Sequence, residues 1–153
     1  MPLLDYSTKV PAEQTAGEIV KLLAIKRAIA IMMQYDEAGN GQIVGLSWKV
    51  RTPHGDLPFT LPVNVDAVEK VLERQYHARQ VSRNYTGRDQ ARRVAWRITL
   101  EWVKAQMALL DTEMVSLDQL FLPYMRVGPN ETLYERMLTT RFQVALTEGK
   151  SQG

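Results

Sequence analysis

The 153-residue sequence predicts one α+β domain spanning residues 1–153: an N-terminal helix, a three-stranded antiparallel meander, a long helix pair and two shorter C-terminal helices. Three observations lead to this fold class. Apolar residues alternate with a period of two between residues 28 and 61, and they recur every three to four residues on both sides of that region. In addition, no linker, internal repeat or low-complexity tract divides the chain, whose length is typical of one domain.

The first helix is expected to begin at a capping box, in which Thr15 and Glu18 each satisfy an unpaired backbone amide of the first turn. Ile19, Leu22 and Leu23 follow at helical spacing.

Three strands are expected next, separated by turns at Asp36–Gly41 and Thr52–Asp56. Pro58 and Pro62 place the third strand at a sheet edge, because proline cannot donate to a ladder. The residues expected to face the core are Ile29, Ile31, Met33 and Tyr35 in the first strand, Val44, Leu46, Trp48 and Val50 in the second, and Leu57, Phe59 and Leu61 in the third.

Capping residues mark the later helices. Asn64 should start a helix that runs to about Gln80, and a breaker-rich loop, Ser82–Gly87, follows it. Thr86 with Asp89 can open the next helix, which continues to about Leu110. Two capping boxes, Ser116 with Gln119 and Thr132 with Glu135, predict short C-terminal helices.

The long helix carries two apolar stripes. The first is expected to face the meander, and the second needs cover either from the C-terminal helices or from a second copy of the chain. The first stripe is Ala91, Val94, Ala95, Ile98, Trp102, Ala105 and Leu109, and the second is Trp96, Leu100, Val103, Met107 and Leu110. In a self-associating protein, Trp96, Leu100, Val103 and Met107 would form the interface.

Positive charge is concentrated in one segment. Eight basic and two acidic residues lie between Arg74 and Lys104, a net charge of +6 in a chain whose total is +2. Guanidinium groups chelate phosphate oxygens and aromatic rings stack on bases, so this segment is a candidate nucleic-acid surface. The candidate contacts are Arg79, Arg83, Tyr85, Arg88, Arg92, Arg93 and Arg97. The alternative is a solvated face whose arginines pair with acidic residues, as the spacing of Arg97 and Glu101 allows.

Other chemistry has little support in the sequence. The absence of cysteine excludes disulfides and thiolate metal sites and indicates a reducing, cytoplasmic compartment, and no stretch is apolar enough to span a membrane. The glycines of GNGQIVG precede a strand rather than a helix, which argues against a phosphate loop. His54, Asp56 and His77 are too few for a metal site, so neither a metal nor another cofactor is expected. No known catalytic motif occurs, although an unrecognised site around these three residues stays open.

The stretches YDEAGNGQIVGLSWKVRTPHGDLPFTLPVN, RRVAWRITLEWVKAQMALLD, FLPYM and TLYERM resemble a group of small uncharacterised proteins carried by phages and prophages. The resemblance covers most of the chain. It implies no activity, so no functional residue is transferred. The order of three strands and then a helix is also similar to the core of phage single-strand annealing proteins, an analogy of fold order alone.

These observations lead to two functional hypotheses. The first is a small non-catalytic protein that binds DNA or RNA through the arginine-rich loop and helix start, in the DNA metabolism of a phage or mobile element. The second is a protein-interaction module, either a homo-oligomer or an inhibitor or adaptor of a host protein, which uses the second apolar stripe. An enzyme of unrecognised type is the third possibility.

Overall fold

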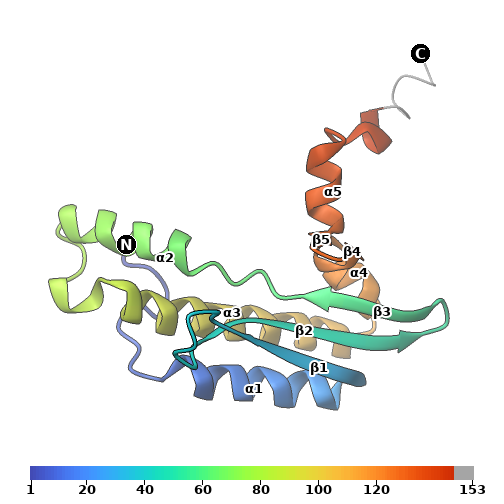
Figure 1. Ribbon diagram of the computed structural model, residues 1–153, viewed down its shortest axis with the longest axis horizontal. Coiled ribbons are helices and arrows are strands. Elements are labelled where there is room, and N and C mark those ends of the chain that lie inside the picture. The colour runs from blue at the N-terminus through green and yellow to red at the C-terminus, as the bar shows by residue number, and fades with distance from the viewer. Residues whose placement is uncertain (147–153) are drawn as a thin grey trace.

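The core of the fold is a three-stranded sheet lying on two parallel helices, α1 (Ala12–Ile25) and α3 (Arg88–Asp111) (Figure 1). The computed structural model describes residues 1–146. The sheet has the order β1-β2-β3 with antiparallel neighbours, as expected for a meander. Its strands are β1 (Ala28–Tyr35), β2 (Ile43–Thr52) and β3 (Gly55–Thr60). The predicted α+β class and element order are therefore confirmed.

Two β-bulges change which residues of the sheet face the core. Ala28 pairs with Val50 and Ala30 with Lys49, so Ile29 is an extra residue on β1. Val44 is likewise an extra residue on β2. Each bulge shifts the alternation by one, and Ile29 and Val44 are exposed although they were expected to face inward. Tyr35, at the end of its strand, is also exposed.

The main core joins the inner face of the sheet to α1 and α3. Trp48 stacks on Phe59 with ring centroids 5.4 Å apart, and Phe121 meets Trp48 edge-on at 5.2 Å. Such aromatic pairs contribute about 0.5–1.5 kcal/mol each beyond the area they bury. The residues buried in this cluster are Ala12, Ala16, Ile19, Leu23, Ile43, Leu46, Trp48, Val50, Phe59, Leu61, Trp96, Leu100, Val103, Met107 and Phe121.

Helix α2 (Val65–His77) packs on the other side of α3 and forms a second, smaller core. Asn64 caps α2 by accepting a hydrogen bond from the backbone N–H of Ala67, as expected. Leu72 of α2 is buried against Ala91 and Val94 of α3. The long helix is therefore covered on two sides within one chain.

This arrangement corrects the assignment of the two stripes of α3. The stripe containing Trp96 and Met107 packs on the sheet and α1, whereas the stripe containing Ala91 and Val94 packs on α2. Trp102, near the other end of α3, is partly buried against the rings of Phe121 and Tyr124. The prediction that the meander covers the first stripe is wrong.

The start of α1 also differs from the expected one. The helix begins at Ala12 after Pro11, so Thr15 lies inside the helix, fully buried, and does not cap it. Pro11 is the residue before the helix, and its φ of −59° is close to the helical value, so the helix starts three residues earlier than Thr15.

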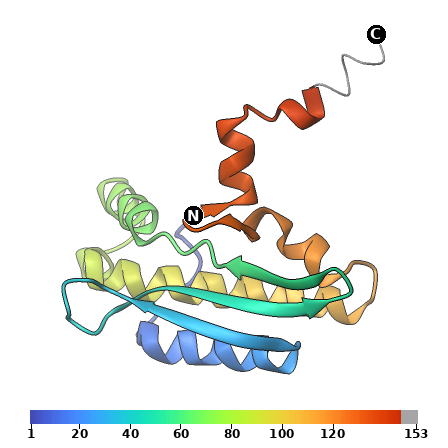
Figure 2. The same cartoon turned by 45° about the vertical axis from the view of Figure 1, so that its right-hand side comes forward.

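The C-terminal part packs beside β3 and then leaves the body of the domain (Figure 2). Helix α4 (Leu117–Phe121) precedes a small hairpin, β4 (Arg126–Gly128) and β5 (Glu131–Thr132), which was not predicted. Met125 forms a bridge with Phe59 and so joins the hairpin to the sheet. Helix α5 (Leu133–Thr139) then projects outward.

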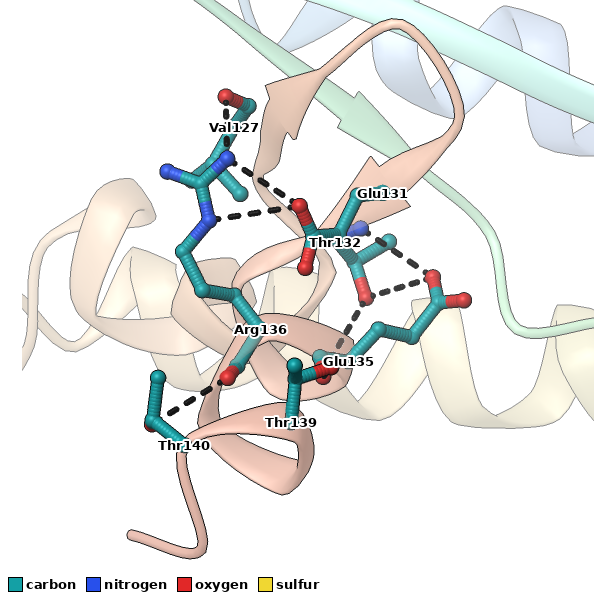
Figure 3. Close-up of polar contacts among 7 residues, drawn as sticks. All are labelled: Val127, Glu131, Thr132, Glu135, Arg136, Thr139 and Thr140. Carbon is teal, nitrogen blue, oxygen red and sulfur yellow. Dashed lines mark hydrogen bonds and ion pairs between the residues drawn. The ribbon is translucent and has the colours of Figure 1, made fainter. Parts of the chain in front are cut away.

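Both C-terminal capping boxes are present, at Ser116 and at Thr132. Figure 3 shows the second: the Thr132 hydroxyl accepts a hydrogen bond from the backbone N–H of Glu135, whose carboxylate accepts one from the N–H of Thr132. Arg136 connects α5 to the hairpin by donating to Glu131 at 3.0 Å and to the backbone oxygen of Val127 at 3.1 Å. Among residues 1–146, no helix is long and apolar enough to cross a membrane.

Candidate nucleic-acid interface

The arginine-rich segment runs from the end of α2 through a 3₁₀ turn at Arg83–Tyr85 into α3. Gly87 precedes the first residue of α3 with φ of 93°, a conformation that glycine adopts without strain. The expected cap, Thr86, instead donates its hydroxyl hydrogen to the backbone oxygen of Arg83 and so stabilises the turn. The start of α3 has no side-chain cap from the part of the chain that the structure describes.

Two arginines of the segment bind acidic residues of α2. Arg83 donates to Glu73 at 2.8 Å, and its guanidinium lies 4.7 Å from the centre of the Tyr76 ring. Arg88 bridges Asp66 and Glu69. Hydrogen bonds to these carboxylates raise the pKa of both arginines. Arg83 and Arg88 therefore connect the loop and α3 to α2, as the alternative interpretation of a paired arginine face expected.

Arg97 is paired as well, but with α1. It donates to Glu18 at 2.7 Å, whereas its expected i, i+4 partner, Glu101, makes no ion pair within residues 1–146. Together with an ion pair between Lys26 and Asp111, this contact shows that α1 and α3 run in the same direction.

Arg92 and Arg93 have the weakest charge compensation among the arginines of α3. Arg92 contacts the exposed carboxylate of Asp89 at 3.4 Å, a long distance for a charge-assisted hydrogen bond. Its side chain is only 11% exposed, and its Nε atom has no hydrogen-bond partner within residues 1–146. Arg93 donates to the neutral amide oxygen of Gln90 at 3.1 Å.

The buried side chain of Gln90 connects the N-terminal segment and Arg93 to α3. Its Nε2 donates to the backbone oxygens of Tyr6 and Thr8 at 2.8 and 3.0 Å, which fixes the N-terminal segment against α3. The oxygen of the same amide group orients Arg93. A buried glutamine therefore links the position of a cationic side chain to the fold.

A groove of about 230 Å³ lies where the first turns of α1 and α3 meet the chain leading into β2. We call this region the helix-start surface, and its residues are Ala12, Glu13, Gln42, Asp89, Arg92 and Arg93. Within residues 1–146, neither helix has a side-chain cap, so two helix N-termini with their partial positive charge lie next to two guanidiniums. Glu13 and Asp89 in the first turns oppose this positive potential.

The β1–β2 turn completes the surroundings of the groove. Asp36 accepts hydrogen bonds from the backbone N–H of Ala38 and the side chain of Asn40. These bonds, with smaller contributions from Arg92 and Arg88, lower the pKa of Asp36. These hydrogen bonds connect Asp36 to the rest of the turn.

The remaining predicted contacts lie apart from this groove. Tyr85 meets Tyr6 edge-on with centroids 5.3 Å apart and packs against the N-terminal segment. Arg79 is exposed in the connection after α2, with φ of 60°. The structure thus brings Arg92 and Arg93 together and assigns Arg83, Arg88 and Arg97 to contacts within the fold. Sequence reasoning missed Gln42 and Gln90, because glutamines give no signal without knowledge of the packing.

The predicted interface on α3 is not accessible in this fold. Trp96, Leu100, Val103 and Met107 are all buried within the chain, between the helix, α1 and the sheet. These residues are therefore covered by the chain itself: by α1, by the sheet and, as expected of the short helix around Phe121, by α4, whereas Phe142 is exposed.

The two histidines lie on different elements, the β2–β3 turn and helix α2. His54 lies in the β2–β3 turn, where its backbone N–H donates to Thr52, and Asp56 pairs with Arg51 at 3.3 Å. His77 lies 3.4 Å from Glu73 on the exposed side of α2. Residues 1–146 contain no group of three or more potential metal ligands.

Comparison of the chain with protein-family models, curated proteins and solved structures gives no match.

Proposed function

We propose that this protein binds the phosphate backbone of nucleic acid, without catalysis, at the helix-start surface. The observation that carries this proposal is the adjacency of Arg92 and Arg93 at the start of α3, where their charges are weakly compensated by neighbouring residues. Arg83, Arg88 and Arg97 are already paired with acidic residues of α2 and α1, so their charges are compensated within the chain.

Helix geometry supports an anionic ligand at this surface. The parallel N-termini of α1 and α3 each carry roughly half a positive charge, and backbone amides at helix starts bind phosphates in many proteins. The guanidiniums add donors whose fork matches two phosphate oxygens. Asp89, which is exposed, competes with phosphate for Arg92.

A polymer suits the site better than a small phosphate compound. The groove is formed by three separate elements, α1, α3 and the chain leading into β2, so its polar groups are spread over several parts of the fold. Distributed contacts of this kind give sequence-independent affinity for a chain of phosphates. The setting that we propose is the DNA metabolism of a phage or mobile element, in line with the resemblance of the sequence.

The test is fluorescence anisotropy with labelled single-stranded and double-stranded oligonucleotides at low salt. The variant Arg92→Gln/Arg93→Gln should bind at least about tenfold more weakly, because two charged contacts are lost. Asp89→Asn should bind more tightly, since it frees Arg92 and removes a negative charge. Arg83→Gln, which removes a charge that is already paired, is the matched control and should bind like the wild type. Equal affinities of all four proteins would contradict the proposal.

A second candidate function, protein interaction, is supported by the exposed apolar residues of the projecting C-terminal arm. Tyr134 and Leu138 of α5 and Phe142 after it are spaced four residues apart, and all three are exposed. The Tyr134 and Phe142 rings lie 6.3 Å apart. If this arm binds a protein, Leu138→Asp should abolish that binding and leave oligonucleotide affinity unchanged, as measured by pull-down and anisotropy.

A further inference from the structure

The two edges of the three-stranded sheet differ in how they are protected. On β3, Pro58 removes one backbone donor, and the bridge from Phe59 to Met125 brings the β4–β5 hairpin alongside. On β1, the only backbone ladder within residues 1–146 is the one with β2 (Figure 1). The outer side of β1 therefore presents unpaired backbone groups.

The composition of β1 lacks the features that normally keep an edge strand single. Its sequence, AIAIMMQY, contains no charged residue and no proline. Ile29, Met32 and Tyr35 are 45%, 52% and 53% exposed. The bulge at Ile29 affects only the start of the strand, and Ala30–Gln34 pair regularly with β2. An exposed apolar edge of this kind is a template for another strand.

Charges at the two ends of β1 indicate which strand fits. Arg27 precedes β1 and Glu37 follows it, both are exposed, and neither makes an ion pair within residues 1–146. If two copies of β1 run antiparallel about a two-fold axis at Met32, Arg27, just before the strand of one copy, comes to the same end of the pair as Glu37, just after the strand of the other. Ile29 then lies opposite Tyr35, and Met32 lies opposite Met32 of the second copy. The exposed apolar residues of β1 in one copy therefore meet apolar residues of β1 in the other.

We propose that β1 is a dimerisation strand, through which two copies pair antiparallel about a two-fold axis at Met32. The two sheets then form one continuous six-stranded sheet, and the unpaired backbone groups of both edges are satisfied. This interface is distinct from the helix-start surface and from the buried stripe of α3. The proposal does not rest on nucleic-acid binding, and its tests use no nucleic acid.

Cross-linking tests the axis directly. The chain contains no cysteine, so a single introduced thiol is unique. Residues directly opposite in an antiparallel pair have Cβ atoms about 4.5–5.5 Å apart, close to the separation that a disulfide requires. Under mild oxidation, Met32→Cys should form a covalent dimer on a non-reducing gel. Val44→Cys is the control, because Val44 is similarly exposed but lies on the central strand. Equal cross-linking of both variants, or of neither, would overturn the proposal.

Charge reversal tests the orientation and register without changing the core. Sedimentation velocity should show a dimer for the wild type at concentrations up to about 100 µM. Arg27→Glu and Glu37→Lys should each raise the dimer dissociation constant by up to about tenfold, because each brings like charges together at both ends of the paired strands. The double variant should restore wild-type association, and Lys70→Glu on α2 should have no effect. A monomeric wild type, or single variants that are not rescued by the double variant, would contradict this pairing.

Discussion

Arg97 on α3 donates to the carboxylate of Glu18 on α1 at 2.7 Å, and this bond joins the two parallel helices that support the sheet. The arginine belongs to the basic segment, yet its charge is used within the fold. Both side chains are partly exposed, with relative exposures of 22% and 42%, so water screens the pair. Its contribution to stability is therefore about 0.5–1 kcal/mol.

Arg97→Ala should lower the free energy of unfolding by about 1 kcal/mol, which includes lost packing of the arginine stem on α1. It should leave oligonucleotide affinity within about twofold of the wild type. Urea denaturation and anisotropy on the same preparation measure both effects. A large loss of affinity with unchanged stability would place Arg97 in the binding surface.

The two tryptophans of α3 should differ in their contribution to stability. Trp96 is fully buried between the helix and the sheet, whereas Trp102 is only partly buried against Phe121 and Tyr124. Trp96→Ala should cost about 3–5 kcal/mol, the usual range for removing a buried aromatic side chain, and Trp102→Ala should cost less. Chemical denaturation of both variants tests this order. A greater cost at Trp102 would mean that the packing of α3 is described incorrectly.

Asp5 should make the stability of the protein depend on pH. Its Oδ2 atom is buried without a hydrogen-bond partner in residues 1–146, and its φ is 59°. Burial, followed by the nearby carboxylate of Glu101, raises the pKa of Asp5 above its ordinary value of 3.8. The folded state therefore binds this proton more tightly than the unfolded state does, and folding is penalised as pH rises from 3.8 through the raised pKa.

Asp5→Asn should remove this penalty, because the amide stays neutral and asparagine tolerates positive φ. At pH 7 the variant should be more stable than the wild type, by on the order of 1 kcal/mol. Well below pH 3.8, where Asp5 is protonated in both the folded and the unfolded state, this contribution should disappear. Thermal unfolding across this pH range measures both limits. A variant that is less stable than the wild type at pH 7 would show that the Asp5 carboxylate makes a favourable interaction.

Gly87→Ala should destabilise the start of α3 through the backbone alone. A Cβ atom at this position would meet no atom of residues 1–146 within 4 Å, but φ is 93°. Alanine in that conformation should cost about 1–3 kcal/mol. Because the start of α3 positions Arg92, oligonucleotide affinity should fall together with stability. An unchanged melting temperature would contradict the strained backbone.

The fold class and most elements follow from the sequence because period, turn chemistry and caps are local signals. Asn64 and Thr132 cap helices where their sequence context predicts. The bulges at Ile29 and Val44 could not be predicted in this way, since a bulge is set by the register of the neighbouring strand. The β4–β5 hairpin is too short to show a period of its own.

The surroundings of the arginines could be predicted less well than the fold, for a physical reason. A cluster of arginines is visible in the sequence, but the acidic residues that neutralise Arg83 and Arg88 lie on another helix, at Asp66, Glu69 and Glu73. Their pairing depends on how α2 packs on α3. The two apolar stripes of α3 can likewise be recognised in the sequence. Which element packs on each stripe depends on the tertiary structure.

The most direct test of the proposed function is the salt dependence of duplex DNA binding by the wild type and by Arg92→Gln/Arg93→Gln. Each phosphate contact adds about 0.9 to the slope of log affinity against log salt. If both arginines bind phosphates, the slope of the double variant should be smaller by about two, and Arg83→Gln should keep the wild-type slope. Identical slopes for the wild type and the double variant, or a wild-type affinity that does not change with salt, would contradict phosphate recognition at the helix-start surface.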